Sequence, residues 1–270
     1  MQVEVSANDA SGVHAESFLS TEILLPHIDE QRRIASRLDG VDAVAADLQS
    51  KAAHADALNN ALVVALALRP DLDDAAKEKA GWTHTPLGDV LSPSDRTVPV
   101  EPASSYLVAG IYSFGRGLID RGLIQGAETS YARMTRLAAG DVAVSKLNGW
   151  EGAVAVVGDE FDGFHVSSEY PTFVPDRARL LPGFFAGIAR APSFWDDLNV
   201  SARGSMVRRR RINPAEFLST RVWLPPLEVQ AATAEALATA AETSRTRRTS
   251  SDRIDALVPA ALNEAFAGIS

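Results

Sequence analysis

The sequence predicts an α+β protein in which one mixed domain is carried on two long helices that form an antiparallel coiled coil. Two observations indicate this arrangement: a motif that occurs twice, and a change from helical to strand-like patterns between its two copies. With 270 residues, 46% of them hydrophobic, the chain is long enough for one globular unit with a sizeable core and two arms.

The repeated motif reads FLSTEILLPHIDEQ at residues 18–31 and FLSTRVWLPPLEVQ at residues 217–230. The copies align without a gap at an offset of 199 positions (217 minus 18), and they share Phe-Leu-Ser-Thr, a Leu-Pro pair and a final Gln. That offset is far longer than the repeat of a solenoid. The repeat therefore predicts a duplicated arm on either side of a unique middle.

The first arm, residues 17–80, follows a tail at residues 1–16 that has no clear period. After Pro26, apolar residues recur at spacings of seven, which is typical of a coiled coil. The pair Arg69-Pro70 should end the helix. An amphipathic helix that lies on its own domain is the alternative.

The second arm, residues 216–270, should begin its helix at Pro225-Pro226. Because the middle domain joins the end of the first arm to the start of the second, we expect the arms to run antiparallel and to bury each other's apolar positions. The expected coiled-coil seam consists of Ile34, Val41, Leu48, Leu62, Leu237, Ile254 and Leu257.

The middle domain, residues 81–215, contains β-branched and aromatic runs that glycines and turn pairs interrupt. These runs predict strands in a twisted, mostly antiparallel sheet, at residues 106–110, 141–147, 152–167 and 170–175. Apolar residues at helical spacing after Pro182 and Pro192 predict two short helices.

Enzyme signatures are missing from the sequence. It contains no GxxxxGK[ST], HExxH or GxSxG motif, no cysteine, and five histidines without the spacing of metal ligands. We therefore expect no catalytic residue, no metal site and no cofactor on this chain. No export signal or membrane span is visible, which favours a cytoplasmic protein.

The candidate binding residues lie in three glycine-rich segments that combine basic, amide and aromatic groups. The net charge is −9, but residues 81–215 contain 14 basic and 14 acidic side chains, so cations gathered on one face could meet phosphates. Arginine and asparagine can also bind base edges. The candidates are Tyr112, Arg116, Lys146, Asn148, Trp150, Arg203, Ser205, Arg208, Arg209, Arg210 and Arg211.

Each segment also has a plainer interpretation. The first two could be turns with an incidental charge, and the arginine run could be a solvated charge cluster. Side chains alternate along an extended segment, so we expect either Arg208 with Arg210 or Arg209 with Arg211 to face DNA, and the other pair to form internal ion pairs.

Three stretches resemble the specificity (S) subunits of type I restriction-modification systems. They are GWTHTPLGDVL at residues 81–91, GSMVRRRRINPAEFLSTRVWLPPLEVQ at 204–230 and ALVPAALNEAFAG at 256–268. The resemblance covers residues 17–270. It implies a target-recognition domain that reads double-stranded DNA, carried on a helical spacer. One such domain is present where the family has two, so the chain looks like a half-length or truncated S subunit.

The resemblance also implies partners. Methyltransferase (modification) subunits would bind the helices and a motor-nuclease restriction subunit would join them, so that S-adenosylmethionine, Mg and ATP belong to those partners. With a single recognition domain, we expect a homodimer or a second recognition subunit. The rival hypotheses are a coiled-coil structural adaptor whose middle domain binds protein, and a self-sufficient DNA-processing enzyme. DNA affinity that falls steeply with salt would separate the first hypothesis from the adaptor.

Overall fold

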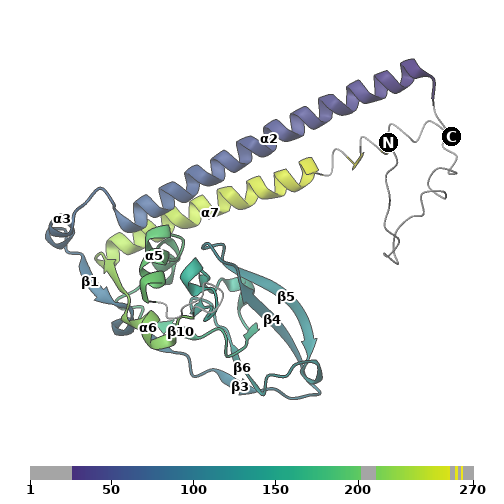
Figure 1. The fold of residues 1–270 in the computed structure, drawn as a ribbon. Coiled ribbons are helices and arrows are strands. Elements are labelled where there is room, and N and C mark those ends of the chain that lie inside the picture. The colour runs from purple at the N-terminus through teal and green to yellow at the C-terminus, as the bar shows by residue number, and fades with distance from the viewer. Residues whose placement is uncertain (1–25, 202–210, 256–258, 261–262, 264–270) are drawn as a thin grey trace, which may run out of the picture. The chain divides into compact units, whose positions relative to one another are not determined.

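The computed structural model describes residues 26–201 and 211–255, together with residues 259, 260 and 263 (Figure 1). The chain divides into two units, which are described separately. One contains the residues up to Ala52 and those from Arg248 onward, and the other runs from Ala53 to Arg247. No helix in the described part of the chain is long and apolar enough to cross a membrane.

Helix α2 spans Ile28–Leu68. Asp29 and Glu30 lie in its first turn, where the helix dipole favours acidic side chains. It ends at Arg69, whose φ of 45° is left-handed, and Pro70 follows, which cannot continue a helix. The long helix predicted from the apolar repeat is thus present, with the expected end.

The predicted seam on α2 needs a correction. Leu62 is 53% exposed and Leu48 is 36% exposed, whereas Val63 is 1% exposed. Placing Leu62 on the buried side was wrong because a strict repeat of seven drifts around a straight helix by about 20° per heptad, or roughly 80° over the four heptads from Ile34. That drift turns Leu62 toward solvent and brings Val63 to the buried side. Ile34 and Val41 are half-buried.

Within the unit Ala53–Arg247, the end of α2 runs antiparallel beside the start of α7, which spans Leu227–Asp255 (Figure 1). Helix α4, Pro182–Ala189, packs on both. A Cβ atom at Gly187 would lie 2.7 Å from Leu237 Cδ1 and 2.8 Å from Ala67 Cβ. The absence of a side chain at Gly187 therefore lets three helices meet closely. Of the other seam candidates, Ile254 lies in α7 and Leu257 falls outside the described residues.

The strands form three sheets, and the confirmed α+β class rests on them and on the helices. The strands are β1 Thr83–Pro86, β2 Leu91–Pro93, β3 Thr97–Pro99, β4 Ser105–Ile111, β5 Leu118–Gln125, β6 Arg133–Arg136, β7 Val142–Val144, β8 Val154–Val156, β9 His165–Val166, β10 Thr172–Pro175 and β11 Arg221–Leu224. Their orders are β1-β11, β2-β10-β7-β8 and β3-β6-β9-β4-β5. Every pairing among them is antiparallel except that of β4 with β9.

Short helices fill the connections. They are α3 Asp74–Lys79, η1 Leu87–Asp89, η2 Gly126–Glu128, η3 Gly149–Glu151, η4 Asp159–Phe161, α5 Pro192–Ser201 and α6 Pro214–Ser219. Helices α4 and α5 begin at Pro182 and Pro192, the positions that the prolines predicted. Asn213 caps α6 through a capping box with Glu216.

The main core lies between the four-stranded sheet and helices α4, α5 and α6. Its largest fully buried side chains include Phe173, Phe184, Phe185 and Phe217, and the rings of Phe173 and Phe217 stack with centroids 5.2 Å apart. Burying such a side chain contributes about 1.5–3 kcal/mol. The four-stranded sheet is therefore well packed and holds the loops at its edge, such as the β7–β8 connection, in fixed positions.

The strands β1 and β11 close the domain by pairing its beginning with its end. Helix α3 packs beside them: the ammonium group of Lys77 lies 6.0 Å from the ring centre of Trp82 and 5.7 Å from that of Trp223. Both distances allow cation–π attraction. The end of the predicted first arm thus contains a separate short helix that contacts the domain.

The repeated motif forms the same helix start twice. In the second copy, Gln230 is 1% exposed and its Nε2 donates to the Pro225 carbonyl at 2.9 Å. In the first copy, Gln31 Nε2 donates to the Pro26 carbonyl at 2.8 Å. Gln230 makes two further bonds, since its Oε1 accepts from Leu181 N and its Nε2 donates to the Arg179 carbonyl, each at 2.9 Å. The second copy is therefore also hydrogen-bonded to the domain.

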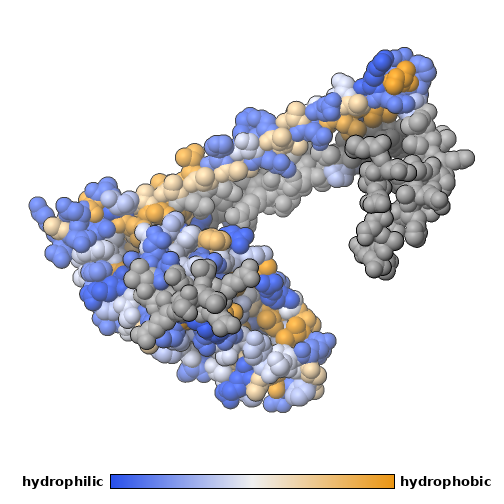
Figure 2. Space-filling model, in the orientation of Figure 1, coloured by the Kyte–Doolittle hydropathy of each residue, from blue (hydrophilic) through white to orange (hydrophobic). Residues whose placement is uncertain are grey.

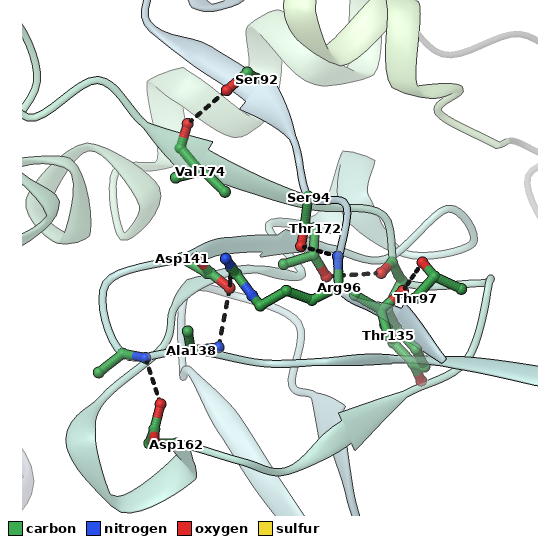
Figure 3. Close-up of polar contacts among 12 residues, drawn as sticks. Ser92, Ser94, Arg96, Thr97, Thr135, Ala138, Asp141, Asp162, Thr172 and Val174 are labelled. Carbon is green, nitrogen blue, oxygen red and sulfur yellow. Dashed lines mark hydrogen bonds and ion pairs between the residues drawn. The ribbon is translucent and has the colours of Figure 1, made fainter. Parts of the chain in front are cut away.

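An ion pair joins the four-stranded and five-stranded sheets (Figure 3). Arg96, which precedes β3, donates to the Oδ2 of Asp141, which precedes β7. Asp141 is 3% exposed, and its Oδ2 also accepts from Ala138 N at 3.0 Å. Thr97 and Thr135 add a hydroxyl contact of 3.0 Å between β3 and β6. The Arg96–Asp141 ion pair therefore fixes the four-stranded sheet against the five-stranded sheet.

Candidate functional site

The turn that joins β4 to β5 carries the first group of predicted residues. Tyr112 N donates to the Gly117 carbonyl at 2.9 Å and closes the turn. The Arg116 guanidinium lies 4.6 Å from the ring centre of Tyr112, and its Nε donates to the Ser113 carbonyl at 3.1 Å. Arg116 is exposed and already oriented, because the ring and the carbonyl both hold its guanidinium group.

This turn is attached to the connection between β7 and β8, which contains η3. Phe114 N donates to the Glu151 carbonyl at 2.8 Å and Gly115 N to the Gly152 carbonyl at 3.0 Å. Ser113 Oγ donates to Glu151 Oε2 at 3.4 Å. Two loops from different sheets are thus joined by backbone bonds, which makes their relative position well defined.

Trp195 of α5 fills the space beneath both loops. A Cβ at Gly152 would lie 2.5 Å from its ring, and a Cβ at Gly115 would lie 3.0 Å from its ring and 2.7 Å from Arg190 Cα. The Trp195 Nε1 donates to the Ala189 carbonyl at 2.8 Å. Gly115 and Gly152 also have positive φ angles of 61° and 76°. Glycine is required at these two positions both for the backbone conformation and for the close approach.

The second predicted group lies in the β7–β8 connection. Lys146 and Trp150 are half-buried and Asn148 is exposed. Trp150 Nε1 donates to the Leu147 carbonyl at 2.8 Å, and Asn148 N donates to Ser145 Oγ at 3.2 Å. The backbone around Asn148 is therefore ordered by local bonds, while its amide side chain lies at the surface.

The third predicted group is joined to the same two loops, β4–β5 and β7–β8, through Arg211 and Ile212. Together these three segments are called the loop cluster. Ile212 N donates to the Lys146 carbonyl at 3.0 Å, and Lys146 N donates to the Glu169 carbonyl at 2.9 Å. Arg211 forms an ion pair with Glu169. The structure thus brings Arg116, Lys146 and Arg211 to neighbouring segments. Arg203, Ser205, Arg208, Arg209 and Arg210 fall outside the described residues.

The ion pair of Arg211 bears on the predicted alternation of arginines. Arg211 pairs with an acidic side chain, as expected for the arginines of the run that do not face DNA, but the pair lies at the surface rather than inside the domain. Because Arg211 keeps a side chain that is 48% exposed, the pair is a surface one and contributes about 0–1 kcal/mol. The pair therefore orients Arg211 more than it stabilises the fold.

Phe114 is an exposed residue of this cluster with an unusual backbone. Its φ is 63°, in the left-handed region, and its side chain is 58% exposed. That conformation costs roughly 1–2 kcal/mol for a residue with a Cβ atom. The ring contacts Trp195 in an edge-on arrangement with centroids 6.1 Å apart.

Two acidic side chains and one tryptophan of the cluster were not among the predicted residues. Glu151 and Glu169 hold the loops through their backbone carbonyls and carboxylates, and Trp195 supports them from α5. No local pattern could have identified them because their partners are distant in sequence. On α5, burial raises the pKa of Asp197, and the nearby Asp196 adds to the effect.

Known proteins with a similar fold are found among solved structures. No family model and no curated protein sequence matches the chain. The type I restriction-modification S subunit from M. genitalium matches with a TM-score of 0.53 and 12% identity, over 88% of this chain and 61% of that one. A chain from a structure of complex assembly and conformational transition of the type I R-M system matches with a TM-score of 0.53 and 18% identity, over 90% and 60%.

The chain has the fold of a type I restriction-modification S subunit. The HsdS subunit from Thermoanaerobacter tengcongensis also matches, with a TM-score of 0.48 and 18% identity over 91% of this chain and 60% of that one. The chain thus spans about 60% of the length of the S-subunit structures it matches. The resemblance seen in the sequence is confirmed at the level of the fold, with one α+β domain and two long helices.

Proposed function

We propose that this chain is the non-catalytic DNA-recognition component of a type I restriction-modification complex. The observation that carries the proposal is the joining of three predicted segments, around Arg116, Lys146 and Arg211, into one loop cluster. The fold shared with S subunits supports it. Guanidinium and ammonium groups on a rigid base suit phosphates, and exposed amide and aromatic groups suit base edges.

Roles within the cluster follow from its interactions. Arg211 is held by Glu169, so the proposal assigns phosphate binding to Arg208 and Arg210. Arg116 is oriented by Tyr112, and Asn148 has an exposed amide, so both are assigned to base recognition.

The helices would serve partner subunits. On α2, Leu58 is 73% exposed and Leu62 is 53% exposed, four residues apart on one face. Figure 2 shows apolar residues, in orange, among hydrophilic ones along this helix. Large exposed apolar side chains on a regular helix favour a protein partner. We assign this face to modification subunits, with the motor-nuclease subunit joining them. S-adenosylmethionine, Mg and ATP would then be bound by those partner subunits.

The repeated helix start supports a second recognition domain. Gln230 bonds to its own domain through Leu181 and Arg179, whereas Gln31 occupies the same place in the first copy of the motif. A recognition domain of another chain, or of a second copy of this chain, would bind at Gln31 as this chain's own domain binds at Gln230. One short half-site discriminates poorly against a genome, so two domains are needed for specificity.

Salt-dependent binding tests the proposal. A fluorescent duplex of random sequence should bind the full chain with an affinity that falls steeply as salt rises, because bound phosphates release their counterions. Arg208→Ala with Arg210→Ala should lower the slope of log affinity against log salt by about 1 for each phosphate that is no longer bound. A salt-independent affinity, or no binding, would favour the adaptor hypothesis.

A further inference from the structure

The conformation of Phe114 is not explained by the packing of the domain. Its φ of 63° is a conformation that glycine adopts freely and bulky side chains rarely adopt. The ring is nevertheless 58% exposed, so the fold gains little apolar burial from it. Arg69, the other described non-glycine residue with positive φ, lies at the end of α2, where left-handed residues are common.

The backbone of Phe114 is fixed on both sides. Its own N–H and that of Gly115 donate to the carbonyls of Glu151 and Gly152 at 2.8 and 3.0 Å. Gly115 lies so close to α5 that a Cβ there would be 3.0 Å from the Trp195 ring. The Phe114 ring meets Trp195 only edge-on, at 6.1 Å between centroids. The loop therefore presents an aromatic ring in a preset position.

The surroundings of Phe114 suit a nucleic acid. Arg116 lies two residues along the same turn, stacked on Tyr112 at 4.6 Å. The joined loop contributes Lys146 and Leu147, of which Leu147 is 44% exposed. Two cationic side chains, Arg116 and Lys146, thus lie on the same two joined loops as the exposed apolar side chains of Phe114 and Leu147. In a duplex, the apolar surfaces available to such side chains are the faces of the bases. Proteins that kink DNA insert such apolar wedges between base steps.

We propose that Phe114 is a wedge that inserts at a base step of duplex DNA bound to the loop cluster. The proposal rests on the proposed DNA-binding function and adds that the bound duplex is partly unstacked. The left-handed backbone holds the ring outward before DNA arrives, so that little conformational freedom is lost on insertion. The binding free energy would then depend in part on how easily the base step at Phe114 is deformed, which varies with the DNA sequence.

A plasmid topology assay tests this wedge. A singly nicked plasmid is ligated in the presence of the full chain, and the linking number is measured after the protein is removed. Unstacking at each bound site reduces the twist, so wild type should shift the linking number in proportion to bound protein. Phe114→Trp should retain the shift. Phe114→Gly should lose it, while binding the same plasmid with an unchanged salt slope.

The variants separate a wedge from a structural role. Glycine accepts the positive φ, so Phe114→Gly keeps the turn without strain. Tyr131→Ala is the matched control, since Tyr131 is 43% exposed and follows the opposite end of the β4–β5 hairpin. This control should keep the full shift. Salt-dependent binding without a shift, or a shift that survives in Phe114→Gly, overturns the wedge alone. Absence of any DNA binding by wild type overturns the proposed function as well.

Discussion

Replacing Gln230 by leucine should destabilise the domain far more than the same change at Gln31. Gln230→Leu removes three hydrogen bonds of 2.9 Å and leaves one part-buried N–H and two carbonyls without their partner. Three bonds at about 0.5–1.5 kcal/mol each give roughly 1.5–4.5 kcal/mol, and the burial of the abandoned groups raises the expected loss to about 3–5 kcal/mol. Gln31→Leu removes one bond at a half-buried position, worth about 1 kcal/mol.

Urea unfolding followed by tryptophan fluorescence measures the difference. Trp82 and Trp223 both report on the domain, because they lie beside α3 and the β1–β11 pair. With a slope of about 2 kcal/mol per molar urea, a loss of about 4 kcal/mol lowers the midpoint by about 2 M. Equal shifts for Gln230→Leu and Gln31→Leu, or a shift below about 0.5 M for Gln230→Leu, would refute the view that this side chain fixes the helix to the domain.

Three further predictions concern stability. Asp141→Ala should cost about 3 kcal/mol in urea unfolding because it leaves Arg96 without its charge partner between the sheets, and Arg96→Met with Asp141→Leu should recover much of that loss. Val63→Ala should lower the free energy of unfolding by about 1–3 kcal/mol and Leu62→Ala by under about 1 kcal/mol, because Val63 is 1% exposed and Leu62 is 53% exposed. A larger loss for Leu62→Ala would instead support a buried position for Leu62, as the strict repeat of seven predicts. Burial lowers the pKa of His165, so folding favours its neutral form. The resulting stability should be fully present above the ordinary pKa of about 6.5 and fall as the pH drops through the lowered value, and His165→Phe should flatten that slope in pH-dependent melting curves.

Much of the fold could be predicted because its signals are local. The long apolar repeat, the prolines at 26, 182 and 192, and the β-branched runs each act within a few turns of chain, and α2, α4, α5, β4, β7 and β8 appear where they indicated. Strand β5 was missed because its glycine-rich surroundings resemble a loop. Leu118–Gln125 becomes a strand through pairing with β4.

The candidate site could be predicted by segment, whereas the interactions that join its segments could not. Glycine-rich loops with cations are visible in sequence, so Arg116, Lys146 and Arg211 could be chosen as candidates, and their segments are neighbours in the structure. Their joining depends on Trp195 and Glu169, which have no signal in the sequence near those loops. The burial of Val63 in place of Leu62 likewise depends on the exact helical period, which only the folded helix reveals.

Sequencing of selected DNA tests sequence recognition by the loop cluster most directly. The full chain is used to capture duplexes from a random pool, in parallel with Asn148→Ala and with Arg116→Ala. Wild type should enrich a short motif, and each variant should lose the preference at particular bases, by about 1–3 kcal/mol per base, while retaining most of its total binding. Enrichment of no motif by wild type, or an identical motif with both variants, would contradict the assignment of base recognition to this surface.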